Sequence, residues 1–455
     1  MTEKMIPTDD QEHAIRRMVA EADDTGGVIL GAEPGTGKTL ICVETALRMG
    51  AKTILVIAPL GTRVGWERTF RAQGYTGPIT RVETNNLKAM DDLRASVPGV
   101  YIVGREYFRL KKNDWSKIKP DFCVADEAHF FANRQTLSFK QMKTLKPKFR
   151  VASSGTWFGN KFEGSWAVSR WLWTSMVDPS FWRWVARWAH TETIYMKING
   201  SLKEVTKVTR EKNPGSYASA VPCYVFLEAD SDLELVKSNR YVELTPAQRK
   251  MYSQMENDAF AWLEEHPLVA ELPIAQRTRL RQMTLGTVTL DDEGTVNFAD
   301  DCKSGKFDAL QEILADLPAD EKVLILTSSA KFARVVAKRL GAALWIGATK
   351  HDERERILST FGDGKYLVAG IAALGEGVDG LQHHCSTMIW LDKSENNMLN
   401  QQVEARLVRK GQTKPVHSYE IIATDTLDEG IMNSLLTQTI NNRRSMEVRS
   451  GSHEV

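Results

Sequence analysis

The strongest constraint on the fold is a rhythm that occurs twice along this 455-residue chain. Short runs rich in Val and Ile alternate with helical patterns in roughly residues 25–160, and again in about 303–440. Runs that are apolar at nearly every position form strands buried on both faces, and intervening helices permit parallel pairing. The sequence therefore predicts two α/β domains, each a parallel sheet covered by helices. The predicted strands are Val28–Ala32, Thr53–Ala58, Tyr101–Gly104, Phe122–Asp126, Arg150–Ser153, Lys322–Thr327, Ala343–Ile346, Tyr366–Ile371, Thr387–Asp392 and His417–Ala423.

Residues 161–300 interrupt this rhythm with aromatic helical segments and a candidate β-hairpin. The hairpin is predicted at Asn199-Gly200, because both central positions of a type I′ turn need positive φ and the flanking residues partly alternate. We therefore expect three parts: a first lobe at 1–160, an insertion and linker at 161–300, and a second lobe at 301–455. Helical spacing separates Phe181, Trp184, Val185 and Trp188. This spacing favours a stripe of core-packing residues over a platform on which bases stack.

Composition limits the possible classes of protein. The 59 Lys and Arg residues nearly balance the 58 Asp and Glu residues, so any nucleic-acid contact must use a local basic surface. Five well-separated cysteines without a CxxC pair fit neither a disulfide framework nor a zinc ribbon. The charged N-terminus is unlike a signal peptide, and no apolar run approaches the ~18 residues of a membrane span. We expect a soluble, cytoplasmic protein that makes no membrane contact.

A phosphate-binding loop is predicted directly after the first strand. Glu33, Pro34, Gly35, Thr36, Gly37, Lys38 and Thr39 lie between that strand and a helical pattern that begins with Leu40. The two glycines let backbone N–H groups converge on phosphate oxygens, the helix N-terminus adds its dipole, and Lys38 adds a charge. Thr39 is the expected magnesium ligand. Ala32 stands where the strict motif has Gly, so the match is to a looser form that opens with Ala.

An acidic pair follows a later strand of the same region. The apolar run Phe122–Ala125 ends in Asp126-Glu127-Ala128-His129. The carboxyl edge of a parallel sheet is where such folds bind ligands. We expect Asp126 to hold Mg²⁺ through water and Glu127 to orient and deprotonate the attacking water. A solvated acidic turn is the alternative, and the loop upstream makes it the weaker one.

These motifs, in this order, resemble motifs I and II of superfamily 2 helicases. The segment Gln402–Gln412 resembles the QxxxRxxRxGQ motif VI of the Swi/Snf-type DNA translocase family. Further resemblances run along nearly the whole chain: Thr8–Val19, Ala58-Pro59-Leu60 with Trp66-Glu67, Ser154-Gly155-Thr156, Leu244-Thr245-Pro246, Ser304-Gly305-Lys306 and Gly375–Gln382. We expect nothing appended at either end, which would make the chain similar to compact versions carried by bacteriophages.

The resemblance implies a fold and a chemistry. The fold would be two tandem RecA-like P-loop domains with a helical and hairpin insertion, hydrolysing ATP with Mg²⁺ between them. Lys38, Asp126 and Glu127 would act from the first lobe. Arg406 and Arg409, expected on one face of a helix, would act from the second as arginine fingers. Gln11 resembles the family's adenine-reading residue, although a solvated Gln near a helix start is an equal alternative.

The resemblance also implies residues that couple hydrolysis to movement along DNA. The coupling residues would be Ser154, Gly155, Thr156, Gly375, Gly377, Asp379 and Gln402. Contacts to double-stranded DNA are expected at Arg63, Trp66, Lys161, Thr327 and Ser328, all from motif position. A motor must bind successive positions equally, so phosphates rather than bases would be held. The chain departs from the family pattern at Trp157, Asp379 and Glu395, all in motifs that contact or couple to nucleic acid.

The sequence thus predicts an ATP-dependent helicase or translocase acting on duplex DNA. A DEAH-type RNA helicase is an alternative that the form of motif VI disfavours. A P-loop phosphotransferase acting on a small molecule is a second alternative, disfavoured by the second lobe with its paired arginines. A non-catalytic scaffold is disfavoured by the complete set of Lys38, Asp126, Glu127 and both arginines. If the phage resemblance holds, the location is the cytoplasm of an infected bacterial host.

Overall fold

A computed structural model describes residues 4–110, 114–198, 201–228, 233–263, 266–269, 273–291, 294–361, 364–375, 380–409 and 411–446. The chain forms two compact units, Met1–Asp230 with Gln438–Val455, and Ser231–Thr437. The segment 161–300, predicted as one insertion, is divided between these units. The three-part domain division therefore stays a prediction, whereas the predicted fold of two α/β units with parallel sheets is confirmed.

The first unit is built on a seven-stranded sheet in the order β3-β4-β2-β5-β6-β1-β9, with parallel pairing throughout. Its central strands are buried at nearly every position, which is why they read as continuous apolar runs in the sequence. The strands are β1 (Gly27–Ala32), β2 (Thr53–Ala58), β3 (Ile79–Val82), β4 (Gly99–Gly104), β5 (Phe122–Asp126), β6 (Phe149–Ser154) and β9 (Tyr224–Leu227).

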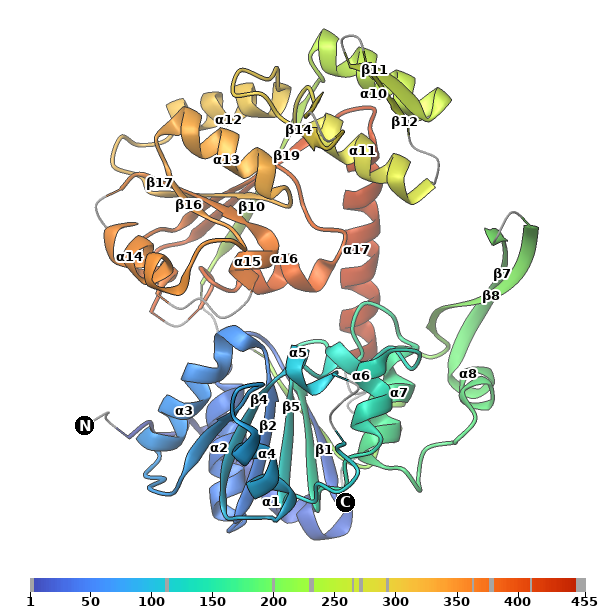
Figure 1. The fold of residues 1–455 in the computed structure, drawn as a ribbon, viewed down its shortest axis with the longest axis vertical. Helices are drawn as coiled ribbons and strands as arrows, with labels where there is room; N and C mark the ends of the chain where they lie inside the picture. Colours follow the sequence, from blue (N-terminus) through green and yellow to red (C-terminus); the bar gives the residue numbers. More distant parts are fainter. Residues whose placement is uncertain are drawn as a thin grey trace. The chain divides into compact units, whose positions relative to one another are not determined.

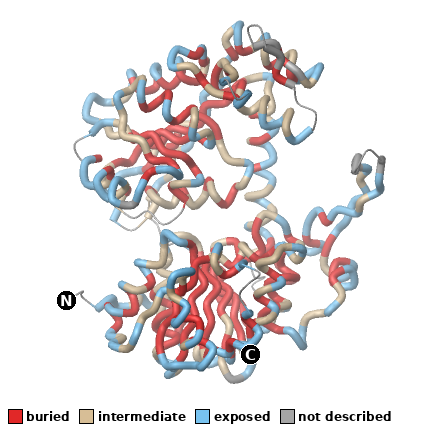
Figure 2. Tube along the Cα trace, in the orientation of Figure 1, coloured by how far each residue is buried: buried red, intermediate tan, exposed pale blue. Residues whose placement is uncertain are grey.

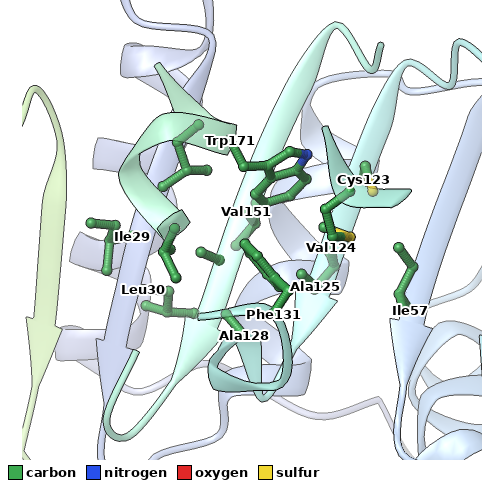
Figure 3. Packing of buried hydrophobic residues seen from close by; sticks show 14 of the residues in the cluster. Ile29, Leu30, Ile57, Cys123, Val124, Ala125, Ala128, Phe131, Val151 and Trp171 are labelled. Atoms are coloured by element: carbon green, nitrogen blue, oxygen red, sulfur yellow. The ribbon is translucent and has the colours of Figure 1, made fainter. Parts of the chain in front are cut away.

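Helices on both faces complete this core. They are α1 (Asp9–Asp24), α2 (Lys38–Arg48), η1 (Leu60–Thr62), α3 (Arg63–Ala72), α4 (Leu87–Arg94), α5 (Arg105–Phe108), η2 (Ala128–Phe131), α6 (Leu137–Met142), α7 (Gly164–Leu172) and α9 (Ser216–Ala220). In Figure 3, Phe131 of η2 and Trp171 of α7 lie over Val151 and Val124 of the sheet. Their rings meet edge to face at 5.3 Å, so the segment after the acidic pair is fixed by aromatic packing.

The predicted hairpin is present as β7 (Ala189–Ile198) paired antiparallel with β8 (Ser201–Glu211); its turn residues lie outside the described ones. It follows α8 (Phe181–Trp188), in which Phe181, Trp184 and Val185 are buried. The predicted packing stripe is therefore correct. Most described side chains of the hairpin are exposed (Figure 2).

The second unit is built on a six-stranded parallel sheet in the order β10-β19-β18-β15-β17-β16. Its strands are β10 (Leu235–Val242), β15 (Val323–Thr327), β16 (Ala343–Trp345), β17 (Tyr366–Gly370), β18 (Thr387–Trp390) and β19 (Val416–Ala423). Two-stranded pairs β11 (Phe260–Leu263) with β12 (His266–Val269) and β13 (Thr289–Leu290) with β14 (Val296–Asn297) precede most of this sheet.

The helices of the second unit are α10 (Pro246–Asp258), α11 (Pro273–Leu285), α12 (Gly305–Asp316), α13 (Ala330–Leu340), α14 (His351–Phe361), α15 (Ile371–Gly375), η3 (Leu381–His383) and α16 (Asn397–Glu404). Helix α17 (Leu427–Met446) begins in the second unit and ends in residues assigned to the first (Figure 1). Among the described residues, no helix is both long and apolar enough to cross a membrane.

A buried polar cluster fixes the start of α12. Lys306 is completely buried; its Nζ donates to the carbonyl of Leu391 at 2.7 Å and pairs with Asp428 Oδ2 at 2.5 Å. Gln248 of α10 accepts the Gly305 N–H at 2.9 Å and donates to the Met283 carbonyl at 2.9 Å. The segment Ser304-Gly305-Lys306, which the family resemblance singled out, therefore ties α10, α11, α12 and α17 together.

Candidate nucleotide-binding site

Three neighbouring strands of the first unit deliver the predicted ATP-binding residues to one edge of the sheet. Strand β6 pairs with β1 on one side and β5 on the other, all in parallel. The phosphate-binding loop follows β1, Ser154 ends β6 and Asp126 ends β5. Because the carboxyl ends of parallel strands lie at the same edge, residues far apart in sequence, such as Lys38 and Ser154, meet there.

The loop has the backbone shape that a phosphate cradle needs. Gly35 and Gly37 have φ angles of 90° and 84°, a left-handed region that other residues rarely adopt, and α2 begins at Lys38 directly after Gly37. Lys38 Nζ donates to the carbonyls of Ala32 at 2.9 Å and Glu33 at 3.3 Å. The loop thus holds its lysine through its own backbone, with the first N–H groups of α2 alongside.

Gln11 lies against this loop. Its side chain forms a capping box with Thr8 at the start of α1, and its Nε2 donates to the Thr36 carbonyl at 2.8 Å. A Cβ at Gly37 would approach that Nε2 to 2.4 Å, so Gly37 is needed for close packing as well as for its φ. Both ends of the Gln11 amide have protein partners in this structure, and its adenine-reading role stays a prediction.

Asp126 is buried and held by the Trp66 indole from another segment. Its Oδ2 accepts the indole N–H of Trp66 at 3.0 Å and faces the Thr62 hydroxyl at 3.5 Å. Within the described part of the chain, no hydrogen bond reaches its Oδ1. Burial, and then the adjacent charge of Glu127, raise the pKa of Asp126 to about 6. The charges of Lys38 and Arg105 offset this rise in pKa only in part, so this oxygen and this carboxylate suit a bound cation.

Glu127 is held in a strained conformation by its own contacts. Its φ of 52° and ψ of 56° are left-handed, which is uncommon for a non-glycine residue and is found at functional sites. Its Oε2 accepts from the Ser154 hydroxyl at 3.1 Å, and His129 Nδ1 lies 3.3 Å from the same oxygen. Burial raises the pKa of Glu127, but the His129 hydrogen bond and the Lys38 charge outweigh it and hold that pKa at about 2. The carboxylate is therefore ionised at neutral pH and can accept a hydrogen bond from a water molecule.

The donor set fits a magnesium–nucleotide complex. Hard oxygen ligands from one carboxylate and one hydroxyl, together with phosphate oxygens and water, are the usual surroundings of Mg²⁺ in such sites. Asp126 offers Oδ1, Thr39 lies in the first turn of α2, and the loop glycines leave room for phosphates. In this fit, Asp126 and Thr39 would hold the metal, which would neutralise phosphate charge, and Lys38 would contact the phosphates.

The predicted coupling residues on the first unit contact both the loop and the acidic pair. Ser154 bonds Glu127 as described, and its Oγ also accepts the backbone N–H of Thr156 at 3.3 Å. A Cβ at Gly155 would lie 3.4 Å from both the Ala32 carbonyl and Pro34 Cδ, so Gly155 packs directly on the loop. Trp157, where the family has Pro, is buried against Phe158 and Tyr217.

The predicted arginines of the second unit are not on a helix, which corrects our expectation. Helix α16 ends at Glu404, and Arg406 and Arg409 follow it in turns closed by backbone hydrogen bonds such as Arg406 N to Val403 O at 3.0 Å. Glycine at position 411, with φ of 98°, ends the segment. Arg406 Nη2 donates to the Gly375 carbonyl at 2.7 Å, and Gln402 also lies beside Gly375. Gly377 and Asp379 lie outside the described residues.

Two of the five predicted DNA contacts are wrong in this structure. Trp66 is 1% exposed and donates to Asp126, so its ring cannot reach a DNA chain. Thr327 is buried and donates to Asp392 at 2.7 Å. Lys161 and Ser328 are exposed as expected, and Arg63 is half-buried and paired with Glu83. Both errors placed buried strand-end or helix residues on the surface because motif position was used without helix or strand periodicity.

Sequence reasoning missed Thr62 and His129 and gave Trp66 the wrong role. Trp66 and Phe70 are four residues apart and both buried, a spacing that predicts the core face of a helix. His129 is the last residue of the acidic motif, so its contact with Glu127 was open to prediction from proximity alone. For Thr62 the sequence carried no signal, because its hydroxyl meets Asp126 only through the tertiary fold.

Several known proteins are similar to this chain in sequence. Identity is 23% over 479 residues with the "SNF2 domain-containing protein ENL1" of Oryza sativa subsp. japonica, covering 90% of this chain and 48% of that protein. Sequence identity is 24% with an uncharacterized ATP-dependent helicase of Mycoplasma genitalium, and the match covers 92% of this chain and 40% of that protein. It is 23% with the "DNA repair and recombination protein RAD54-like" of Drosophila erecta, covering 92% and 61%. The chain spans about half the length of the curated relatives it matches.

Among solved structures, the chain is similar to the SWI2/SNF2 ATPase core of Sulfolobus solfataricus in complex with dsDNA. That similarity has a TM-score of 0.44 and 19% identity, and covers 98% of this chain and 95% of that one. The sequence model of the SNF2-related domain matches residues 10–284, more than half of this chain. That match includes the phosphate-binding loop, the acidic pair and Ser154. The chain therefore belongs to the SNF2-related family.

Proposed function

We propose that this protein is an ATP-dependent translocase or helicase acting on double-stranded DNA. One observation carries the proposal: β1, β6 and β5 bring a lysine-bearing phosphate-binding loop, Ser154 and an acidic pair to one sheet edge in a chain of the SNF2-related family. The similar proteins named as an ATP-dependent helicase and as a DNA repair and recombination protein support DNA as the substrate.

The chemistry follows from the site. Lys38 and the loop N–H groups bind the phosphates of ATP, and Thr39 with Asp126 holds Mg²⁺. Glu127, fixed by Ser154 and His129, orients a water and accepts its proton. We include Arg406 and Arg409 in the proposal as residues that neutralise charge on the transferred phosphoryl group; their support is the resemblance of Gln402–Gln412 to motif VI.

The alternatives have less support. An RNA helicase of the DEAH type shares the acidic motif, but the family that matches here is SNF2-related. A phosphotransferase needs no second unit like Ser231–Thr437, which has its own parallel sheet. We propose the cytoplasm as the location.

ATP turnover measured with duplex DNA, single-stranded DNA, RNA and no polymer tests the proposal. We expect duplex DNA to stimulate turnover most. Lys38→Ala and Glu127→Gln should abolish turnover, and Arg409→Ala should reduce it severely while ATP binding is largely kept. Turnover that is indifferent to every polymer would instead favour a small-molecule acceptor.

Displacement of a triplex-forming strand, compared with unwinding of a plain duplex, separates the two forms of the proposed activity. A translocase displaces the third strand without separating the duplex, whereas a helicase does both. The same ATP-hydrolysis site serves either outcome, so Glu127→Gln should eliminate both signals.

A further inference from the structure

We propose that Trp66 is a positioning residue for the Asp126 carboxylate, and that through it the segment Leu60–Trp66 controls how that carboxylate receives Mg²⁺. This inference rests on the proposed function, because it assigns a regulator to the same nucleotide site. It replaces the DNA contact that motif position had suggested for Trp66.

Two side chains of one short element face the same carboxylate oxygen. Trp66 Nε1 donates to Asp126 Oδ2 at 3.0 Å, whereas the Thr62 hydroxyl lies 3.5 Å from that oxygen and 3.1 Å from the Pro59 carbonyl, its nearer acceptor. Residues four apart lie on one side of a helix, so both side chains face the carboxylate from the η1–α3 segment. With Oδ2 held in this way, the rotation of the carboxylate is fixed and Oδ1 is the oxygen presented to a cation.

The other side of the same element faces solvent. Leu60 is 48% exposed and Val64 42%, and Gly61 and Gly65 between and beside them are exposed as well. A Cβ built at Gly65 meets nothing within 4 Å. A single helical segment therefore separates Asp126 from solvent on this side. Because the outer side is open to solvent and the inner side carries Trp66, a shift of this segment would reach Asp126 through the indole hydrogen bond.

A purely packing role for Trp66 makes a different prediction from a positioning role. The indole ring is 6.5 Å from Phe70 in the core of the first unit, so a smaller or polar side chain would destabilise the fold in either case. Phenylalanine keeps an aromatic ring but loses the N–H that reaches Asp126 together with part of the indole volume. Trp66→Phe therefore needs a second buried Trp→Phe variant beside it, so that the contribution of the hydrogen bond can be told from that of packing.

Trp115 supplies a matched control in the same unit. It is also completely buried, and its indole N–H donates to the Phe108 carbonyl at 2.9 Å, away from the acidic pair. Trp115→Phe loses one buried indole hydrogen bond of the same kind. Thermal unfolding of both variants measures the loss of stability that they share.

The experiment measures binding of a fluorescent ADP analogue to the full chain as a function of Mg²⁺, and ATP turnover with and without duplex DNA. For Trp66→Phe we expect the half-saturating Mg²⁺ concentration to rise roughly 10-fold, the scale of one hydrogen bond to a charged group. Nucleotide affinity without Mg²⁺ should be unchanged, and the stimulation by DNA should fall. Thr62→Val should shift Mg²⁺ dependence in the same direction by less, and Trp115→Phe should not shift it.

A Mg²⁺ dependence of Trp66→Phe equal to wild type, or one shifted equally by Trp115→Phe, would overturn the inference. Binding of the analogue does not require ATP turnover. The experiment can therefore contradict the inference without contradicting the proposed function, and the reverse. A wild-type protein that binds the analogue with Mg²⁺ but does not hydrolyse ATP contradicts the proposed function and leaves the positioning role measurable.

Discussion

Each unit of the molecule has a buried aspartate at or just after the end of a central parallel strand. The two aspartates differ in how many donors and cations balance the charge of the carboxylate. Asp392, two residues after β18, accepts from the Thr327 hydroxyl, from the backbone N–H and hydroxyl of Ser328, and from Arg281 at 3.1 Å. Asp126, at the end of β5, has Trp66 and Thr62 on one oxygen and the repelling Glu127 beside it. The first carboxylate is satisfied within the protein, and the second is not.

Two lysines that follow glycine at the start of a helix show the same difference. Lys306 is buried, paired with Asp428 and bonded to the Leu391 carbonyl. Lys38 is partly exposed, and among the described residues its Nζ donates only to the carbonyls of Ala32 and Glu33, at the start of its own loop. Similar local sequences thus serve structure in one unit and chemistry in the other, and the distinction lies in charge compensation rather than in the residue types.

The largest expected effect separates the two aspartates. Asp126→Asn should reduce ATP turnover at least about 100-fold, because the metal-holding charge is lost, while the unfolding temperature stays at or above that of wild type. Asp392→Asn should keep turnover per folded molecule within a few-fold of wild type and lower stability by about 1–3 kcal/mol. Equal loss of turnover in both variants would remove the contrast.

The next largest expected effect is the difference in protein stability between the Lys306→Ala and Lys38→Ala variants. Lys306→Ala leaves Asp428 buried without its cation and should destabilise the second unit by about 3–5 kcal/mol, measured by urea unfolding. Lys38→Ala should leave the unfolding midpoint nearly unchanged and eliminate nucleotide binding. A stable Lys306→Ala protein would show that its ion pair is not the structural element we describe.

A pH dependence follows from the raised pKa of Asp126. An aspartate with a folded-state pKa of about 6 binds its proton more tightly than in the unfolded chain, so its favourable contribution is present at pH 4 and lost as pH rises through 6. In Mg²⁺-free buffer, Asp126→Asn should therefore match wild-type stability near pH 4 and exceed it at pH 7.5 by at most about 3 kcal/mol. Mg²⁺ should reduce this difference. A variant less stable than wild type at pH 7.5 would contradict the assignment.

The smallest expected difference concerns the hydroxyls that hold each carboxylate. Ser154→Ala removes the donor to Glu127 and should lower turnover about 10-fold with little change in stability. Thr327→Val removes the donor to Asp392 and should lower stability by about 1–2 kcal/mol without changing turnover. Stopped-flow phosphate release and thermal unfolding distinguish these two results.

Much of the fold was open to prediction from the sequence because buried strands carry continuous apolar runs. Strands such as β2 and β5 were predicted with their observed bounds. Strands β3 and β9 were missed, since β3 has exposed and half-buried positions and β9 follows a long excursion through the hairpin. Strand β10, mostly exposed or half-buried, was missed for the same physical reason.

The site was predictable where its residues are local in sequence and unpredictable where they are not. The loop around Lys38 and the pair Asp126-Glu127 follow from motif and strand pattern. The compensation of Asp392 by Arg281, more than 100 residues away, depends on tertiary packing. The turn that carries Arg406 was predicted as helix because the pattern continues past Glu404, where the helix in fact ends.

The most direct test of the account is ATP turnover of the wild-type chain with and without duplex DNA, beside Glu127→Gln under the same conditions. The account predicts Mg²⁺-dependent turnover that rises with DNA in the wild type, and a fall of about 10²–10⁴-fold in the variant with nucleotide binding retained. Wild-type turnover that DNA does not change, or a variant as active as wild type, would contradict it.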